Sequence, residues 1–321
     1  MPQMKAAVLV RPGEFDVRET PLPEPGEREI RVKIESCGVC ASNIPPYEGR
    51  PWFEYPLQPG ALGHEACGWI DALGPNASKG WKIGQRVALL SQHAYAEYDV
   101  AADQAIVALP EALNEQQVPA EPVACAINIF KRSGIKAGDT VAIVGVGFLG
   151  ALLIQLAASA GAEVIALSRR SSALSIGRSC GATDFASLGC PETALLQIQK
   201  ATNGRLCDVV IEATGKQAPL NLASEITKER GRLIIAGYHQ DGGRQVNMQL
   251  WNWRGLDVIN AHERDPEIYI QGMREGVEAL ADGRLSTEPL LTHHFPIEEL
   301  GNALEMTRDR PDGFMKALIR F

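Results

Sequence analysis

Two short segments near the N-terminus concentrate side chains that bind metal ions. Cys37 and Cys40 form a C-x-x-C sequence, and Gly63 is followed by His64 and Glu65. A thiolate, an imidazole and a carboxylate together are a ligand set typical of zinc. Both segments contain glycine, as a tight loop around an ion would require. The sequence therefore predicts a metal site, whereas a redox role for the C-x-x-C is disfavoured because no thioredoxin-like βαβ pattern surrounds it.

A glycine-rich turn in the middle of the chain indicates a second kind of chemistry. The turn follows the short β-branched run Thr140–Val144 and precedes the uncharged apolar stretch Phe148–Ala160, and its glycines have G-x-G-x-x-G spacing. A strand, such a turn and a helix form the unit that binds the pyrophosphate of a dinucleotide at the helix N-terminus. The predicted cofactor contacts are Gly145, Val146, Gly147, Phe148, Leu149 and Gly150.

The next predicted strand, Val164–Leu167, ends in Ser168, Arg169 and Arg170. An NAD-binding unit usually carries Asp or Glu at this place, to accept hydrogen bonds from the adenine ribose hydroxyls. No carboxylate is present here to repel a 2′-phosphate, and two guanidinium groups can pair with that phosphate. We therefore predict NADP(H) in preference to NAD(H). The alternative is that the arginines form a solvated loop and the protein does not discriminate.

The segment from about 119 to 261 alternates between predicted helices and strands. Helices are expected near 119–133, 172–180, 191–201 and 217–228, and strands at Asp208–Ile211, Leu233–Ala236 and Val258–Ala261. This alternation predicts an α/β fold of the Rossmann type, a doubly wound parallel sheet with helices on both faces. Ligands of such sheets bind at the carboxyl ends of the strands, so Thr214 and Gly237 are expected to line the cofactor crevice.

The first 118 residues are predicted to be mostly β structure. Short apolar runs occur at Ala6–Val10, Ile30–Ile34, Cys67–Leu73, Val87–Leu90 and Ala94–Val100, separated by segments rich in Pro and Gly. Such runs are typical of a barrel or sandwich-like domain. Helices near 266–282 and 297–308 and a final strand, Ala317–Phe321, follow the parallel sheet, and we expect that strand to rejoin the β domain. The predicted domains are 1–118 with 262–321, and 119–261.

Composition excludes several classes of function. With 321 residues, 45% of them apolar and 22% charged, the chain resembles soluble globular proteins large enough for two domains. A net charge of −8 argues against a nucleic acid partner. No apolar run reaches the roughly 18 residues of a membrane span, and the N-terminus lacks a secretory pattern. We therefore expect a cytoplasmic protein with no membrane partner, in which seven scattered cysteines form no disulfide framework.

The order of these motifs resembles that of a known family. CGVCASN at 37–43, GHEACG at 63–68, EPVAC at 121–125 and then G-x-G-x-x-G look like the zinc-dependent medium-chain alcohol/polyol dehydrogenases. The resemblance extends over the whole chain. It implies a GroES-like, β-rich catalytic domain followed by a Rossmann domain, with the C-terminal segment rejoining the first. It also implies reversible hydride transfer between a nicotinamide cofactor and an alcohol or its carbonyl product.

The resemblance assigns roles to individual residues as well. Cys40 and His64 match the thiolate and imidazole ligands of the catalytic zinc. Glu121 matches the third ligand, and Cys125, four residues later, is a competing candidate. Glu65 matches a nearby carboxylate that can lie beside the metal or move onto it. On this resemblance Cys40, His64 and Glu121 would hold one catalytic zinc, with Glu65 beside it.

Other positions match or depart from the family pattern. Ser42 matches the hydroxyl that binds the substrate alcohol and starts a proton relay. Asn43 stands where an Asp usually orients the histidine ligand, and we expect its side chain to accept the same N–H bond. Pro45 lies near the usual place of a relay histidine, which leaves Tyr47 or the cofactor ribose to carry the proton. No cysteine lies between residues 87 and 109, so the structural zinc lobe is absent and one zinc per chain is expected.

We therefore expect an enzyme that transfers a hydride between NADP(H) and an alcohol or polyol, or its aldehyde or ketone. A zinc-free quinone or enone reductase of the same superfamily would leave Cys40, His64 and Glu121 without a task. A non-catalytic nucleotide-binding protein would not need that ligand set either. His262, after the strand ending at Ala261, is a candidate substrate contact. Family members of this architecture often pair their Rossmann domains, so a homodimer or homotetramer is expected.

Overall fold

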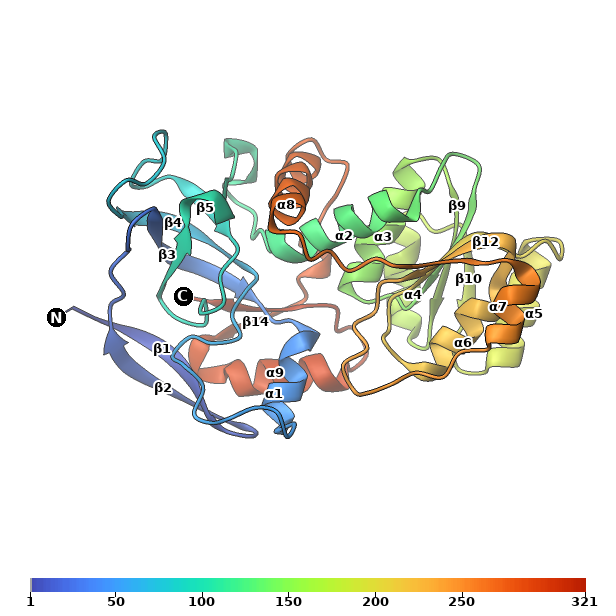
Figure 1. The fold of residues 1–321 in the computed structure, drawn as a ribbon, viewed down its shortest axis with the longest axis horizontal. Coiled ribbons are helices and arrows are strands. Elements are labelled where there is room, and N and C mark those ends of the chain that lie inside the picture. The colour runs from blue at the N-terminus through green and yellow to red at the C-terminus, as the bar shows by residue number, and fades with distance from the viewer. Residues whose placement is uncertain (1) are drawn as a thin grey trace. The chain divides into compact units, whose positions relative to one another are not determined.

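The computed structural model describes residues 2–321, which form two compact units (Figure 1). Unit 1 contains the chain up to Ala124 together with Met273–Phe321, and unit 2 is the continuous segment Cys125–Gly272. Helices α2 (Ala120–Ser133) and α8 (Pro266–Ala281) each extend across a boundary between the units. The domain ranges 1–118 with 262–321, and 119–261, remain a prediction for the functional domains.

Unit 1 is built on a seven-stranded sheet with the order β14-β15-β3-β4-β5-β7, in which β6 also pairs with β3. Its strands are β3 (Glu29–Gly38), β4 (Ala66–Leu73), β5 (Arg86–Leu89), β6 (Tyr98–Ala102), β7 (Ile106–Ala108), β14 (His293–Pro296) and β15 (Ala317–Arg320). A separate antiparallel pair, β1 (Gln3–Arg11) and β2 (Glu14–Pro21), and the helices α1 (Ile44–Glu48) and α9 (Leu300–Asp309) complete the unit.

Strand β3 shows why this sheet forms and how the end of the chain joins it. Its alternating sequence places Ile30, Val32 and Ile34 on one face, where each is at most 2% exposed, because successive side chains of a strand point to opposite faces. Strand β15 pairs antiparallel with the last residues of β3, with Ile319 opposite Cys37. The expectation that the final strand rejoins the β domain is therefore confirmed.

Unit 2 contains a six-stranded parallel sheet with the order β10-β9-β8-β11-β12-β13. The strands are β8 (Thr140–Val144), β9 (Glu163–Ser168), β10 (Asp184–Ser187), β11 (Cys207–Glu212), β12 (Thr227–Ile235) and β13 (Asp257–Asn260). This is the strand order of the doubly wound Rossmann sheet, whose winding reverses between the first and fourth strands, here β8 and β11. The predicted α/β fold class is therefore confirmed.

Two groups of helices cover the parallel sheet (Figure 1). They are α3 (Phe148–Ser159), α4 (Ser171–Ser179), α5 (Pro191–Ala201), α6 (Gln217–Ile226) and α7 (Met248–Arg254). Helices α3 and α4 contact each other, α3 contacts β8 and β9, and α4 contacts β9, whereas α6 contacts both α5 and α7. Strands such as β8 are buried along almost their whole length, because each face of the sheet is covered by helices.

Several elements differ from the sequence expectation. The pattern does not predict the strands β2, β7, β10 and β14 or the helices α1 and α7, which are short or largely exposed. Strand β12 already begins at Thr227, although its residues Glu229 and Arg230 are polar and exposed. Strand β6 begins at Tyr98 rather than near Ala94. Hydrophobic periodicity is weak wherever a strand is not buried, so these boundaries were not visible in it.

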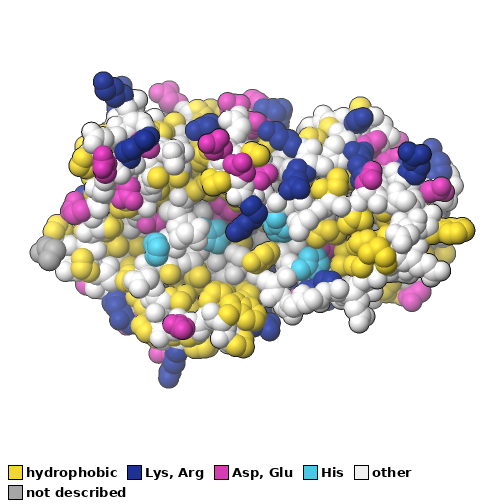
Figure 2. Space-filling model, in the orientation of Figure 1, with side chains coloured by type: hydrophobic (Ala, Val, Ile, Leu, Met, Phe, Trp, Pro, Cys, Tyr) yellow, Lys and Arg dark blue, Asp and Glu magenta, His cyan; other side chains and the backbone are white. Residues whose placement is uncertain are grey.

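Helix character and surface charge bear on the partners that composition disfavours. Among the described residues, no helix combines the length and the apolar character that crossing a membrane requires. Figure 2 shows Lys and Arg interspersed with Asp and Glu over the visible face, with no broad patch of one sign among the side chains drawn there.

A buried arginine connects the segments that lead to the predicted metal ligands. Arg86 in β5 is 3% exposed, and its guanidinium donates to both carboxylate oxygens of Glu35 in β3, at 2.8 and 3.1 Å. It also donates to the carbonyl oxygens of Leu113 and Gln116, which precede α2, at 2.6 and 2.7 Å. Arg86 thus ties the strand that leads to Cys40 to the segment that leads to Glu121.

We predict that Arg86→Met destabilises the protein by about 2–4 kcal/mol, because it removes the guanidinium that donates to two carbonyl groups and the cation beside Glu35, which keeps a hydrogen bond from Gln117. The partial exposure of Glu35 limits the loss. The check is the midpoint of chemical denaturation. Arg284→Met, which removes an exposed ion pair with Asp282, is the control and should change stability by at most about 0.5 kcal/mol. Equal stability of the two variants would contradict the prediction.

Candidate metal centre and cofactor site

Three of the side chains that were predicted to lie at a metal site are close together in unit 1. Cys40 follows β3 and precedes the short turn Ala41–Asn43, while His64 and Glu65 directly precede β4, the antiparallel neighbour of β3. One ligand atom from each of Cys40, His64 and Glu65 lies within 4.8 Å of the other two. The residues meet because the end of one antiparallel strand lies beside the start of its partner.

A backbone carbonyl orients His64. The Nδ1 atom lies 2.7 Å from the carbonyl oxygen of Leu62, so Nδ1 carries a hydrogen and Nε2 is the nitrogen that remains for a metal. The same carbonyl accepts a hydrogen bond from the Asn43 amide at 3.2 Å, and this amide also donates to the Tyr95 hydroxyl at 2.8 Å. The expectation that the Asn43 side chain accepts the imidazole N–H is wrong. Asn43 instead supports the carbonyl that does so.

Negative charge converges on His64. Burial lowers the pKa of an imidazole, yet the pKa of His64 is raised to about 10 by the hydrogen bond and charge of Cys40 and by the charges of Glu121 and Glu65. A cluster that favours positive charge this strongly provides the field that a divalent cation requires. A thiolate, an imidazole nitrogen and carboxylate oxygens also form a donor set that suits zinc. The residues therefore fit that ion.

A buried lysine faces the same cluster. Lys316, just before β15, is 6% exposed, and its Nζ donates to Oε1 of Glu65 at 2.7 Å and contacts Oε2 as well. Burial lowers the pKa of Lys316, but the charges of Glu65, Cys40 and Glu121 raise it further, so the ammonium group stays charged. The position of Glu65 also explains why residue 38 is a glycine, because a Cβ there would lie 2.0 Å from Oε2 of Glu65.

The two candidates for the third ligand have different surroundings. Glu121, in the first turn of α2, is near enough to His64 and Lys316 for its charge to raise the pKa of both. The Sγ atom of Cys125, one turn later, lies 2.9 Å from the hydroxyl of Tyr269 in α8. Glu121 is therefore the candidate whose charge acts on the cluster.

The predicted proton-relay residues differ in what they can do. The Ser42 hydroxyl donates to Oδ1 of Asn43 at 3.5 Å, a long contact that leaves it able to turn toward a ligand. The hydroxyl of Tyr47 in α1 donates to Glu305 in α9 at 3.4 Å. Burial and the negative charge of Glu305 raise the pKa of Tyr47. The hydroxyl of Tyr47 is thus engaged with Glu305, and Ser42 stays the predicted first residue of the relay.

The glycine-rich turn of unit 2 has the geometry of a phosphate-binding loop. Gly145 leaves β8 with a φ of +110°, a conformation that strains any residue with a Cβ. A Cβ on Gly150 would lie 2.1 Å from the Gly145 carbonyl oxygen, whereas a Cβ on Gly147 would meet no atom within 4 Å. Gly147 thus keeps the turn open where a pyrophosphate would lie. Helix α3 follows with no acidic residue in its first turn, which suits an anion.

The residues predicted to select the cofactor lie beside this turn. Ser168 ends β9, and its hydroxyl accepts the backbone N–H of Arg170 at 3.2 Å. The Arg170 guanidinium donates to the carbonyl of Val146 in the glycine-rich turn at 3.4 Å, while Arg169 is exposed. The two guanidinium groups therefore lie at the carboxyl end of β9, next to the strand that leads into the turn.

The remaining predicted cofactor residues, Thr214 and Gly237, follow β11 and β12. Both are held by Glu212, the fully buried last residue of β11, to which sequence reasoning assigned no role. Its carboxylate accepts the Thr214 N–H, and its carbonyl oxygen accepts the Gly237 N–H, each at 2.7 Å. The exposed His262 has its Nε2 3.4 Å from the Gly237 carbonyl oxygen. A charged residue at the end of an apolar strand is the sequence feature that could have identified Glu212.

Known proteins match both units. Residues 26–111 match the alcohol dehydrogenase GroES-like domain, and residues 149–277 match the zinc-binding dehydrogenase family. The chain is 25% identical over 348 residues to a sorbitol dehydrogenase of Bacillus subtilis (strain 168), covering 98% of this chain and 97% of that protein. It is 24% identical over 360 residues to L-galactonate-5-dehydrogenase of Escherichia coli (strain K12), covering 100% of each.

A solved structure agrees with these matches. A proposed zinc-binding dehydrogenase from Sinorhizobium meliloti 1021, bound to NADP, superimposes with a TM-score of 0.85 at 25% identity, covering 100% of each chain. The chain belongs to the zinc-type medium-chain dehydrogenase/reductase family. It is an oxidoreductase of the alcohol/polyol dehydrogenase type, built from a GroES-like domain and a Rossmann domain, in a family that works with zinc and a nucleotide cofactor.

The third ligand can be tested by zinc affinity. We predict that Glu121→Gln, which keeps the side-chain shape and removes the charge, weakens zinc binding by more than the ~10–100-fold typical of lost outer-shell partners. Elemental analysis and competition with a chelator measure the change.

Cys125→Ser, one turn along the same helix, is the matched control and should retain the zinc content and affinity of the wild type. Loss of zinc from this variant alone would assign the third ligand to Cys125 instead.

Proposed function

We propose that the protein is a zinc-dependent dehydrogenase that transfers a hydride between NADP(H) and an alcohol or polyol, or its aldehyde or ketone. The observation that carries the proposal is the convergence of Cys40, His64 and Glu65 within 4.8 Å. The electrostatic influence of Glu121 on His64 supports Glu121 as a further donor. Cys40, His64 and Glu121 would hold one zinc ion per chain, with Glu65 beside them.

When bound, zinc supplies a Lewis acid that lowers the pKa of an alcohol hydroxyl and stabilises the alkoxide. The residues of the chain position and deprotonate the substrate. The Leu62 carbonyl holds His64 so that Nε2 is the coordinating atom. Lys316 holds Glu65 in an ion pair, which keeps this carboxylate from closing the coordination position that a catalytic site leaves open. Ser42 would accept a hydrogen bond from the substrate hydroxyl and, as it takes that proton, pass its own hydroxyl proton on toward the cofactor ribose.

NADP(H) is the proposed cofactor because of the loop after β9. The loop offers the exposed guanidinium of Arg169 and that of Arg170, and residues 168–170 contain no carboxylate. A 2′-phosphate gains charge-assisted hydrogen bonds from guanidinium groups, whereas a 2′-hydroxyl finds no carboxylate to accept its hydrogen bond. The NADP bound to the related Sinorhizobium meliloti protein is consistent with this choice.

The proposed substrates are polyols, sugars or cyclitols and their keto forms. One observation and one part of the proposal support this class. The relatives include sorbitol dehydrogenase and L-galactonate-5-dehydrogenase, and a glutamate as third zinc ligand resembles the polyol-like branch of the family rather than the ethanol-like one. The substrate class rests on this analogy with relatives.

The first experiment is the zinc content per chain, measured by elemental analysis before and after chelation, followed by a screen of polyols and ketones with NADP(H). One tightly held zinc, and activity that chelation abolishes and zinc restores, are the expected results. Protein purified with zinc available that contains none would contradict the proposal and favour the zinc-free quinone or enone reductase. Turnover of no alcohol, sugar or ketone despite NADPH binding would indicate a non-catalytic protein.

The cofactor preference has its own test. We predict that Arg169→Ala raises the Kd of NADPH about tenfold or more, through loss of a charge-assisted hydrogen bond, and leaves the Kd of NADH nearly unchanged. Quenching of protein fluorescence by each cofactor gives both constants.

Arg205→Ala is the control, because Arg205 contacts the carbonyl of Thr202 and lies outside the proposed cofactor residues. It should alter neither constant. Equal wild-type affinity for NADPH and NADH, or an equal loss for both in Arg169→Ala, would rule out the proposed preference.

A further inference from the structure

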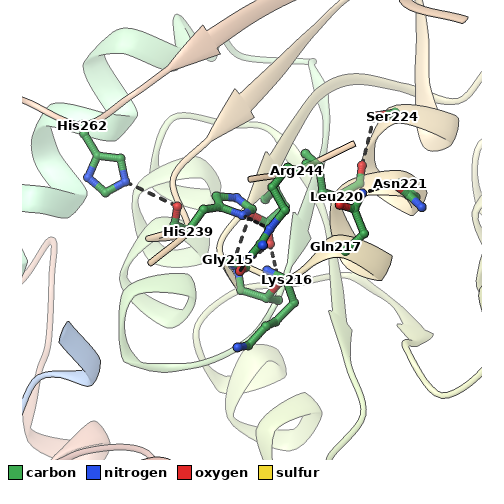
Figure 3. Close-up of polar contacts among 12 residues, drawn as sticks. Gly215, Lys216, Gln217, Leu220, Asn221, Ser224, His239, Arg244 and His262 are labelled. Atoms are coloured by element: carbon green, nitrogen blue, oxygen red, sulfur yellow. Dashed lines mark hydrogen bonds and ion pairs between the residues drawn. The ribbon is translucent and has the colours of Figure 1, made fainter. Parts of the chain in front are cut away.

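A chain of polar contacts at the carboxyl ends of β11 and β12 has no role in the chemistry proposed above (Figure 3). Nε2 of His239 lies 3.0 Å from Oε2 of Glu212, and Nε of Arg244 donates to Nδ1 of His239 at 2.8 Å. A guanidinium can only donate, so Nδ1 is the acceptor and Nε2 carries the hydrogen. His239 is therefore a neutral link between a buried carboxylate and a guanidinium.

Arg244 also joins two loops that are separate in sequence. It lies in the loop after β12, and a second guanidinium nitrogen donates at 2.7 Å to the carbonyl oxygen of Gly215, in the loop after β11. Arg244 pairs with Asp241 in its own loop as well, and Asp241 pairs with Lys216 in the other loop at 3.0 Å. The two loops are thus connected by two ionic or charge-assisted contacts.

The backbones of the two loops are in direct contact. A Cβ on Gly237 would lie 2.2 Å from the backbone nitrogen of Gly215, and a Cβ on Gly215 would lie 2.5 Å from the carbonyl oxygen of Tyr238. The side chains that link the loops are largely shielded, since those of His239 and Arg244 are each 15% exposed and that of Glu212 is 0% exposed. We call the surface formed by residues 213–216 and 236–239 the ledge.

Strand order places the ledge relative to the two halves of a dinucleotide. The arginine loop follows β9, which lies on one side of β8, whereas the ledge follows β11 and β12, on the other side. A dinucleotide crosses the carboxyl edge of such a sheet with its pyrophosphate at the reversal point between β8 and β11. With the adenosine half directed toward β9, the nicotinamide half extends over the ledge.

We propose that Arg244 and His239 are positioning residues for the nicotinamide half of the cofactor. They act through the ledge: Arg244 fixes the loop after β12 against the loop after β11, and His239 transmits that restraint to Glu212, which holds Thr214 and Gly237 in turn. This inference rests on the proposed binding of NADP(H). It assigns no direct contact with the cofactor to Arg244 or His239.

The test compares a whole cofactor with half of one. NADPH covers both halves of the site, whereas 2′,5′-ADP carries only the adenosine half with its 2′-phosphate. We expect Arg244→Met to raise the Kd of NADPH about tenfold, as loss of a charge-assisted contact does, and to leave the Kd of 2′,5′-ADP within about twofold. The fluorescence of the bound reduced nicotinamide should lose anisotropy, because the ring becomes less restrained.

A second pair of variants keeps the test informative should Arg244→Met fold poorly. His239→Gln can still donate to Glu212 and accept from Arg244, so it should retain the affinity of the wild type for NADPH. His239→Leu can do neither. Like Arg244→Met, it should raise the Kd of NADPH and leave the Kd of 2′,5′-ADP nearly unchanged. Arg178→Met, which removes a guanidinium stacked on Phe185 in the same unit, should change neither constant.

The outcomes separate this inference from the proposed function. Unchanged NADPH binding in both Arg244→Met and His239→Leu would overturn the inference alone, and so would an equal weakening of NADPH and 2′,5′-ADP, which would indicate a general effect on folding. A wild-type protein that binds neither ligand would overturn the proposed cofactor and this inference together. A loss confined to NADPH, restored in His239→Gln, supports it.

Discussion

The buried ion pair between Lys316 and Glu65 is the contact on which the candidate metal centre depends. Cys40, Glu65 and Glu121 place negative charge around one imidazole, and such charges repel strongly where little water is present. Lys316 offsets the charge of Glu65 through contacts with both of its carboxylate oxygens. The pairing of β15 with β3 holds the lysine in place, so the sheet of unit 1 and the electrostatics of the site depend on each other.

Most of the donor cluster could be predicted from sequence, because metal-binding side chains are few in type and Cys40, His64 and Glu65 lie in two short segments that neighbouring strands bring together. Lys316 could not be predicted, since 251 residues separate it from Glu65 and a single lysine before an apolar strand has no distinctive pattern. The acceptor for His64 was assigned wrongly because a backbone carbonyl, that of Leu62, leaves no trace in the sequence.

The fold likewise has parts that could be predicted from the sequence and parts that could not. The parallel sheet of unit 2 was predictable because strands such as β8 and β9 are covered on both faces and therefore form continuous apolar runs. The exposed β2, the four-residue β10 and the polar first half of β12 carry no such signal. At the cofactor site the glycine spacing identified the turn, whereas the link from Glu212 through His239 to Arg244 depends on two loops meeting in space.

The position of Lys316 near the end of a discontinuous unit has a consequence for biosynthesis. A ribosome delivers the chain in order, and domains fold as units once their residues have emerged. Unit 2 is continuous and can fold while unit 1 still lacks β14, β15 and Lys316. Before then, Glu65 lacks its buried lysine partner, and His64 or a captured metal is the cation nearest to it. Loading of the metal centre is thus linked to synthesis of the chain through residue 316, and a product truncated before that residue would keep unit 2 whole but leave Glu65 without its lysine.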